Sequence, residues 1–145
     1  MKKLSYLFTR FSFALLLLMS ACDNLEDTDV SPFPDSRDKF VGDWSVNNEN
    51  CGKSKYLVNI RKDLSNSAQV LVSNFAFSQA AVPDTAIIAG SSIVLYKQQN
   101  SEGWSIQGTG SYNDAKDEIS WQYNLTISGY QENCTAIYVK SKRGG

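Results

Sequence analysis

The sequence contains no histidine. Histidine is the commonest general base in enzymes and the base of the catalytic triad, so triad chemistry is excluded. Serine–lysine or paired-carboxylate catalysis is still open, but the adjacent acids Asp117 and Glu118 would face opposite ways on an extended chain. No segment marks a nucleophile or a phosphate-binding loop. We therefore predict a protein that is not an enzyme, with no catalytic residue and no cofactor.

An excess of positive charge is also missing. The chain has 14 Lys and Arg against 15 Asp and Glu, and residues 39–145 hold 10 bases and 9 acids. Nucleic-acid binding requires a basic surface, and the one basic cluster, Lys140, Lys142 and Arg143, lies at the C-terminus. We expect no nucleic-acid partner.

Long hydrophobic runs are absent, and the apolar stretch from Phe11 to Met19 has only nine residues. A helix needs about 20 residues to span a bilayer. Three basic residues, Lys2, Lys3 and Arg10, precede this stretch, and the small residues Ser20 and Ala21 follow it. This pattern predicts a signal peptide over residues 1–21.

The segment "LMSAC", residues 18–22, resembles the lipobox of bacterial lipoproteins, although Met19 stands where Leu is usual. In that family a peptidase cuts before the cysteine, which is then lipidated. The resemblance implies that Cys22 carries acyl chains such as palmitate and anchors the protein to the outer membrane or cell surface. Several chains give stable anchoring. An ordinary signal peptide followed by an incidental cysteine is the alternative.

Residues 22–38 are acidic and contain two prolines, and such a composition cannot bury a core. They are predicted to form a disordered tether behind the lipidated cysteine. The acids are Asp23, Glu26, Asp27, Asp29, Asp35 and Asp38. The patch resembles the surface-export signal of certain Gram-negative lipoproteins, and a plain soluble spacer explains it equally well.

Only three cysteines occur, and lipidation of Cys22 leaves Cys51 and Cys134. Disulfides persist in extracytoplasmic compartments, so we predict that these two pair. Closing a loop of about 84 residues would contribute on the order of 4 to 5 kcal/mol in the chain-entropy model. Two buried free thiols are the alternative. Without histidine a zinc tetrad would also need two carboxylates, so no metal site is predicted.

Helical periodicity is missing after residue 38, and alternation of period two replaces it. In residues 117–128 the apolar side chains from Ile119 to Ile127 alternate with polar ones, which indicates a half-buried strand. Residues 103–112 alternate in the same way, and the turn "NDAKDE" joins the two segments as a hairpin. Further strands are expected at 39–48, 55–62, 68–75, 84–89, 92–98 and 132–140.

Eight strands at this spacing predict an all-β fold, either a sandwich or a barrel. Cys51 follows the first expected strand and Cys134 lies in the last, and closure of an antiparallel up-and-down meander would make those strands neighbours. Gly108 and Gly110 on one face suit a tightly coiled strand. Weak points in an edge strand would explain them too.

The segment "FVGDWSV", residues 40–46, resembles the Gly-x-Trp signature that opens lipocalins and related eight-stranded barrels. Together with the cysteine pair and the closing "NCTAIYVK", it is similar to small lipocalin-like lipoproteins of Gram-negative bacteria. The resemblance covers the mature chain and implies a small lipocalin-like barrel over residues 39–145, in which Trp44 plugs one end. The chain is shorter than classical lipocalins and lacks their further motifs.

Bulky aromatic residues are predicted to face the barrel interior, and we expect Trp104, Tyr112, Trp121 and Tyr123 to line a pocket for a small amphiphilic or glycan-like ligand. Core packing would explain the same residues. The apolar stretch around Phe75 and Phe77 either covers the mouth or packs locally.

The predicted function is therefore a non-enzymatic binding module anchored to the cell envelope. The alternative is an envelope inhibitor of a protease or lysozyme that acts by protein contact, as in the small barrel lipoproteins it resembles. A structural surface protein is a third reading. A ligand-sized cavity would favour the first, and a filled barrel with a protruding apolar loop the second.

Overall fold

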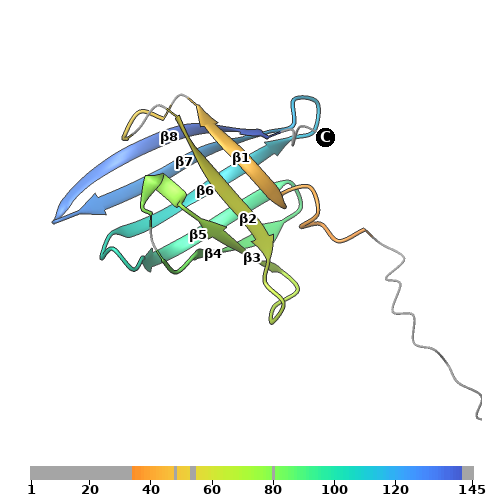
Figure 1. The fold of residues 1–145 in the computed structure, drawn as a ribbon, viewed down its shortest axis with the longest axis horizontal. Coiled ribbons are helices and arrows are strands. Elements are labelled where there is room, and N and C mark those ends of the chain that lie inside the picture. The colour runs from red at the N-terminus through yellow and green to blue at the C-terminus, as the bar shows by residue number, and fades with distance from the viewer. Residues whose placement is uncertain (1–33, 48, 53–54, 80, 142–145) are drawn as a thin grey trace, which may run out of the picture. The chain divides into compact units, whose positions relative to one another are not determined.

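The computed structural model describes residues 34–47, 49–52, 55–79 and 81–141. Over these residues the chain forms a closed barrel of eight antiparallel strands in chain order, which confirms the predicted all-β up-and-down meander (Figure 1). The strands are β1 (Gly42–Asn47), β2 (Lys55–Lys62), β3 (Gln69–Ser73), β4 (Asp84–Ala89), β5 (Ser92–Gln99), β6 (Ser105–Asn113), β7 (Glu118–Ile127) and β8 (Tyr130–Lys140). A short 3₁₀ helix, η1 (Phe75–Phe77), follows β3. No helix within the described ranges is long and apolar enough to cross a membrane.

The barrel closes where β1 meets β8, with registers from Trp44 opposite Lys140 to Asn47 opposite Ile137. β1 pairs with β2 along its other edge. The disulfide between Cys51 and Cys134 ties the loop after β1 to β8, with the two Cα atoms 5.5 Å apart. The predicted disulfide is confirmed, and it crosslinks the seam where the first and last strands pair.

The alternation in β7 decides which side chains form the core. Ile119, Trp121, Tyr123 and Leu125 are buried, whereas Ser120 and Gln122 between them are exposed. Inward residues of the other strands complete one continuous core. The predicted faces of β7 are therefore confirmed.

One end of the barrel is filled around Trp44, which is fully buried. Its indole N–H donates to the backbone carbonyl of Phe40 over 2.8 Å, and the Lys140 ammonium lies 5.3 Å from the ring centroid. Tyr112 packs against both rings, with centroids 5.4 Å from Phe40 and 6.2 Å from Trp44. Trp44 thus fills one end of the barrel, as the Gly-x-Trp resemblance implies.

The glycines of β6 are required by close approach. A Cβ on Gly108 would lie 2.4 Å from Cβ of Tyr123, and one on Gly110 would lie 2.9 Å from the Trp121 ring. β6 pairs with β5 on one side and β7 on the other, so the edge-strand explanation is wrong. The missing side chains let β6 bend closely over the inward rings of β7.

The ordered fold begins before residue 39. Arg37, predicted to belong to the tether, is only 8% exposed. Its guanidinium pairs with Asp35 and donates to the backbone carbonyls of Asp63, Asn66 and Gln69 in the β2–β3 connection. Hydrogen bonding to Arg37 is the main cause that holds the pKa of Asp35 well below its usual range. Lys62 of β2 also forms ion pairs with Asp35 and Asp38, so two cations, Arg37 and Lys62, bind a segment of tether-like composition to the barrel. The other predicted features of residues 1–33, the signal peptide and Cys22 included, lie outside the described residues.

Candidate ligand-binding site

The four predicted ligand-binding residues divide between two ends of the barrel. Trp121 and Tyr123 are 1% and 4% exposed and meet the ring of Phe75, with centroids 5.0 and 4.9 Å away. Tyr112 lies at the Trp44 end, where its hydroxyl donates to the Asp117 carboxylate over 2.6 Å and this bond raises the pKa of Tyr112 to about 12. Trp104 precedes β6 and is partly buried against the core. The structure therefore brings only Trp121 and Tyr123 together, and their ligand role stays a prediction.

Polar side chains gather beside Trp121 and Tyr123 in the interior. The hydroxyls of Tyr56 and Tyr123 both donate to the same oxygen of Glu49, from Tyr56 over 2.9 Å. Tyr138 is fully buried, and its ring centroid lies 5.8 Å from that of Trp121. The end of the barrel that holds Trp121 and Tyr123 thus combines aromatic side chains with ionisable groups.

Four buried polar atoms here have no hydrogen-bond partner in the described part of the chain. They are Glu49 Oε2, Asp84 Oδ2, Trp121 Nε1 and the Tyr138 hydroxyl. Each such group costs about 1–3 kcal/mol of folding free energy, and buried polar groups are normally paired with protein or with ordered water. Two acceptors and two donors are therefore available to a molecule entering this end. We call these four residues the orphan cluster.

The electrostatics of the orphan cluster follow from burial. Asp84 is 3% exposed, and desolvation raises its pKa to about 6. Burial also raises the pKa of Tyr138 well above its usual value; the charges of Glu49 and Asp84 add to this effect, while the neighbouring Tyr56 side chain and Ala76 backbone oppose it. The tyrosines stay neutral at physiological pH and can donate hydrogen bonds.

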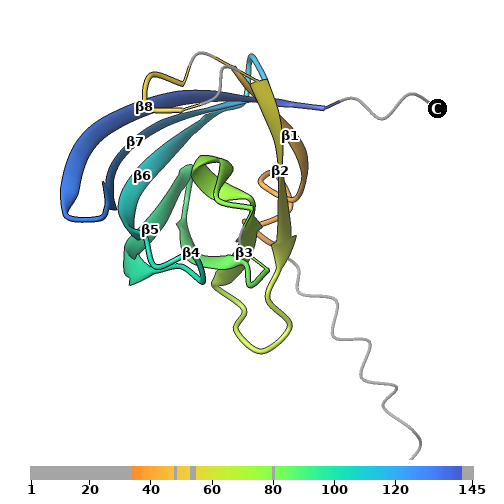
Figure 2. The same ribbon diagram turned by 60° about the vertical axis from the view of Figure 1, so that its left-hand side comes forward.

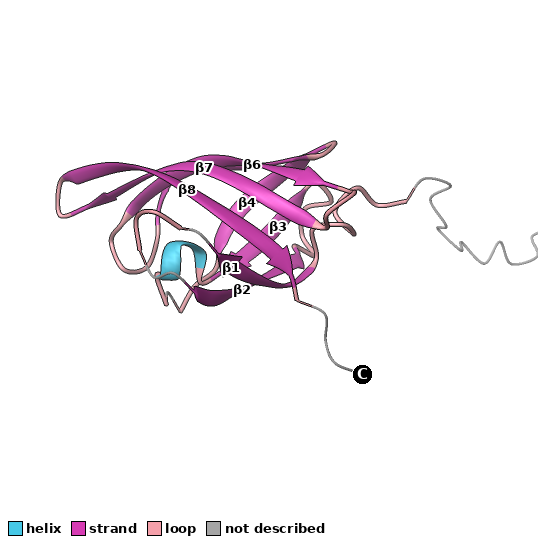
Figure 3. Ribbon diagram, turned by 90° about the horizontal axis from the view of Figure 1, so that it is seen from above, coloured by secondary structure: helices cyan, strands magenta, loops and turns pink. Residues whose placement is uncertain are grey.

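A strained segment closes this end of the barrel. Four non-glycine residues in the connection after β3 have positive φ angles: Asn74 (64°), Ala76 (52°), Phe77 (56°) and Gln79 (52°). Such conformations are uncommon outside glycine and cost on the order of 1–3 kcal/mol each, less for asparagine. Figures 2 and 3 show η1 at the barrel opening. We call residues 74–79 the plug segment.

The plug segment is held by packing as well as hydrogen bonds. Phe75 is fully buried and also contacts Tyr138, at 6.3 Å between centroids. Phe77 packs edge-on against Tyr56 at 5.5 Å, and the Asn74 amide donates to the Leu57 carbonyl over 2.7 Å. The sequence allowed this stretch either to cover the barrel mouth or to pack locally. The plug segment does both, because it covers the mouth by packing into it.

Most of the orphan cluster was missed from sequence, although a signal was present for part of it. Asp84 shares its strand face with the apolar Ala86 and Ile88, and Tyr138 shares its face with Ala136. If the alternation of inward and outward residues had been extended to Asp84 and Tyr138, it would have predicted that both side chains face the barrel interior. Glu49 lies in a loop, where no periodicity marks its direction.

One close group of potential metal ligands occurs in the described part of the chain: Cys51, Glu132 and Cys134. Both sulfurs form the disulfide and so are not thiolate ligands.

Comparison with known proteins leaves the family open. No model of a known protein family matches the sequence, and no curated protein matches it significantly.

Proposed function

We propose that this protein is a non-enzymatic binding module, anchored to the cell envelope through a lipid on Cys22, that takes a small amphiphilic ligand at the plugged end of its barrel. The observation that carries the proposal is the orphan cluster, where four buried polar atoms lie without partners beneath a strained segment. Binding sites combine apolar walls with a few placed polar groups, and this end has both.

The ligand would replace the ring of Phe75. That ring fills the space between Trp121, Tyr123 and Tyr138, so an apolar group of similar size would meet the same aromatic walls. A polar head with both donors and acceptors would satisfy the two carboxylate oxygens, the indole N–H and the tyrosine hydroxyl. Release of the left-handed backbone in the plug segment would offset part of the cost of opening.

The test is native mass spectrometry of the purified full chain after incubation with envelope extract. We expect a bound small molecule that disappears in the double variant Asp84→Asn, Tyr138→Phe. The matched control is Tyr112→Phe at the opposite end, which should keep the ligand. If the folded wild-type chain carries no added mass, ordered water satisfies the orphan cluster and the proposal fails.

The lipid anchor has its own test. Cys22→Ser should move the protein from the membrane fraction to the soluble fraction, because the acyl chains supply the membrane affinity. Unchanged fractionation would contradict lipidation at Cys22 while leaving the ligand proposal intact.

A second candidate function is inhibition of a protease or lysozyme by protein contact. The observation in its favour is that aromatic side chains fill the barrel interior at both ends, while Leu64 in the β2–β3 loop is fully exposed. An inhibition assay against purified lysozyme and serine proteases, repeated with Leu64→Asp, would test it. Absence of inhibition by the wild-type chain would remove this candidate.

A further inference from the structure

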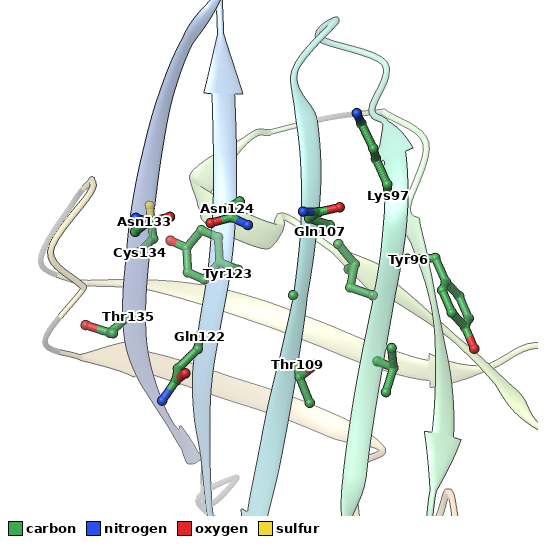
Figure 4. Close-up of a pocket in the computed structure, with 13 residues that line it drawn as sticks. Tyr96, Lys97, Gln107, Thr109, Gln122, Tyr123, Asn124, Asn133, Cys134 and Thr135 are labelled. Atoms are coloured by element: carbon green, nitrogen blue, oxygen red, sulfur yellow. The ribbon is translucent and has the colours of Figure 1, made fainter.

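The outer face of β5 to β8 is hollowed. A depression of about 580 Å³ runs across the four strands and is lined by outward side chains such as Gln107, Thr109, Gln122, Asn124 and Thr135 (Figure 4). A second hollow of about 480 Å³ shares Thr109 and Gln122 with it, and a third of about 280 Å³ shares Gln107 and Asn124. The three share lining residues and form one elongated groove on the outside of the barrel. Its polar side chains are not those of the orphan cluster, although Trp121 belongs to the cluster and also borders the second hollow.

Strand register arranges the groove side chains in rows. Gln107 lies opposite Asn124, which lies opposite Asn133. Thr109, Gln122 and Thr135 form the next row in the same way. Neighbouring strands are about 4.7–4.9 Å apart, so the rows present amide and hydroxyl groups at a repeated spacing. Figure 4 shows Gln107 and Asn124 side by side on adjacent strands.

These polar groups are available to a ligand. In the described part of the chain, no hydrogen bond joins the side chains of Gln107, Thr109, Gln122, Asn124 or Thr135 to another group. Each amide offers two donors and an acceptor, and each hydroxyl is both a donor and an acceptor. The face is therefore equipped for partners that donate and accept at once.

The groove is close to electrically neutral. Lys97 is the one charged residue among the described residues that line the three hollows, although charged residues make up 20% of the chain. A single cation provides little attraction for a polyanion, whose binding depends on several neutralised charges. A neutral partner matches this surface better than an anionic one.

An exposed aromatic ring borders the groove on β5. The register of β5 against β6 shifts between Leu95 and Gln98, and the extra residue leaves both Tyr96 and Lys97 exposed. Tyr96 is 60% exposed. Its ring offers a flat apolar surface and a polar tip, and such a surface suits the C–H face of a sugar ring.

We propose that the β5–β8 groove binds a neutral oligosaccharide chain. Sugar hydroxyls donate and accept hydrogen bonds together, which matches rows of amides and hydroxyls without charge. The length of the groove across four strands suits a chain of several sugar units. A second protein copy fits less well, because the cores of protein interfaces are enriched in aromatic residues, Met and Arg, and Tyr96 is the one exposed aromatic residue among the described residues that line the three hollows. The site is independent of the amphiphile site inside the barrel.

The test is affinity electrophoresis of the purified full chain in native gels containing dextran, mannan or xyloglucan, with heparin and polygalacturonate as charged comparisons. We expect at least one neutral polysaccharide to retard the wild-type chain. The double variant Gln107→Ala, Asn124→Ala should weaken this affinity about tenfold, since it removes several hydrogen bonds. Asn59→Ala on β2, an exposed amide on a strand outside the groove, is the matched control and should bind as the wild type does.

Gln107 is exposed and Asn124 is partly buried, and Asn59→Ala would remove the hydrogen bond that the Asn59 amide donates to Asp43 over 2.7 Å. Urea unfolding of both variants therefore accompanies the gels, and a loss of retardation reports binding where the variant is folded under the gel conditions. Three outcomes of the gels would overturn the proposal. These are no retardation by any neutral polysaccharide, retardation by the charged polymers alone, and equal retardation of the wild type and the groove variant. Self-association that the groove variant abolishes would also overturn it, since a second copy would then cover the face.

Discussion

Asp84 should make the stability of this protein fall as pH rises through the range in which most proteins of this size are stable. Its carboxyl group is 3% exposed, with Oδ2 unpaired, and burial raises its pKa from 3.8 to about 6. A carboxyl group whose pKa is higher in the folded state binds its proton more tightly there. Its contribution to stability is therefore full below about pH 3.8 and is lost as pH rises through about 6.

The size of the effect follows from the same values. One pKa unit corresponds to about 1.36 kcal/mol, so a rise from 3.8 to about 6 corresponds to at most about 3 kcal/mol of unfolding free energy. The absence of histidine removes the side chain that ordinarily titrates at about pH 6.5. Asp35 acts in the opposite direction and at lower pH, because hydrogen bonding to Arg37 lowers its pKa.

The assay is urea unfolding followed by tryptophan fluorescence at several pH values between about 4 and 8. The wild-type free energy of unfolding should fall over this range, and Asp84→Asn, which mimics the protonated carboxyl group, should remove most of the fall. At about pH 8 the variant should be the more stable protein by as much as 3 kcal/mol. Parallel pH profiles for the two proteins would refute the assignment of a buried, unpaired carboxyl group to position 84.

Three further perturbations test the core, the strand contact and the seam. Trp121→Ala should lower the free energy of unfolding by about 3–5 kcal/mol through cavity formation, whereas Gln122→Ala should change it by less than about 0.5 kcal/mol; equal small effects in urea unfolding would reverse the assigned faces. Gly108→Ala should cost about 1–3 kcal/mol, because the new Cβ would lie 2.4 Å from Tyr123 Cβ and the backbone would have to shift; a wild-type melting temperature would show that β6 can move away freely. A reductant should lower the melting temperature of the wild type and leave that of Cys51→Ala unchanged, and insensitivity of the wild type would mean that the disulfide adds no stability.

The fold could be predicted because period-two patterns and cysteine positions carry it. The alternation in residues 117–128 identified β7 and its buried face, since a strand that packs against a core on one side needs that pattern. The positions of Cys51 and Cys134 predicted that the first and last strands pair, and the β1–β8 register agrees. Both patterns can be read directly from the sequence, and both are required by the closed barrel.

The plug segment could not be predicted, because its backbone opposes local preference. Ala76 and Phe77 adopt left-handed conformations that such side chains rarely take. Burial of Phe75 among three aromatic rings and the anchoring of Phe77 on Tyr56 hold that geometry in place. Tertiary contacts therefore decide the conformation, and no short-range pattern reports them. The same holds for Arg37, whose acidic neighbours indicate a solvated segment while its partners lie about 30 residues away.

The barrel interior and the outer groove are two candidate sites that would bind their ligands differently. The interior has apolar rings, the buried carboxyl group of Asp84, the partly buried one of Glu49 and a strained cover. A ligand there must first displace Phe75, so its binding is coupled to the conformation of the plug segment. The outer groove is built on paired strand backbones in continuous register, so its rows are already in place before a ligand arrives. Preformed sites avoid the cost of ordering, whereas the interior site must overcome the packing of the plug. A ligand in the groove should therefore associate without a conformational step, and a ligand in the barrel should bind at a rate limited by opening of residues 74–79.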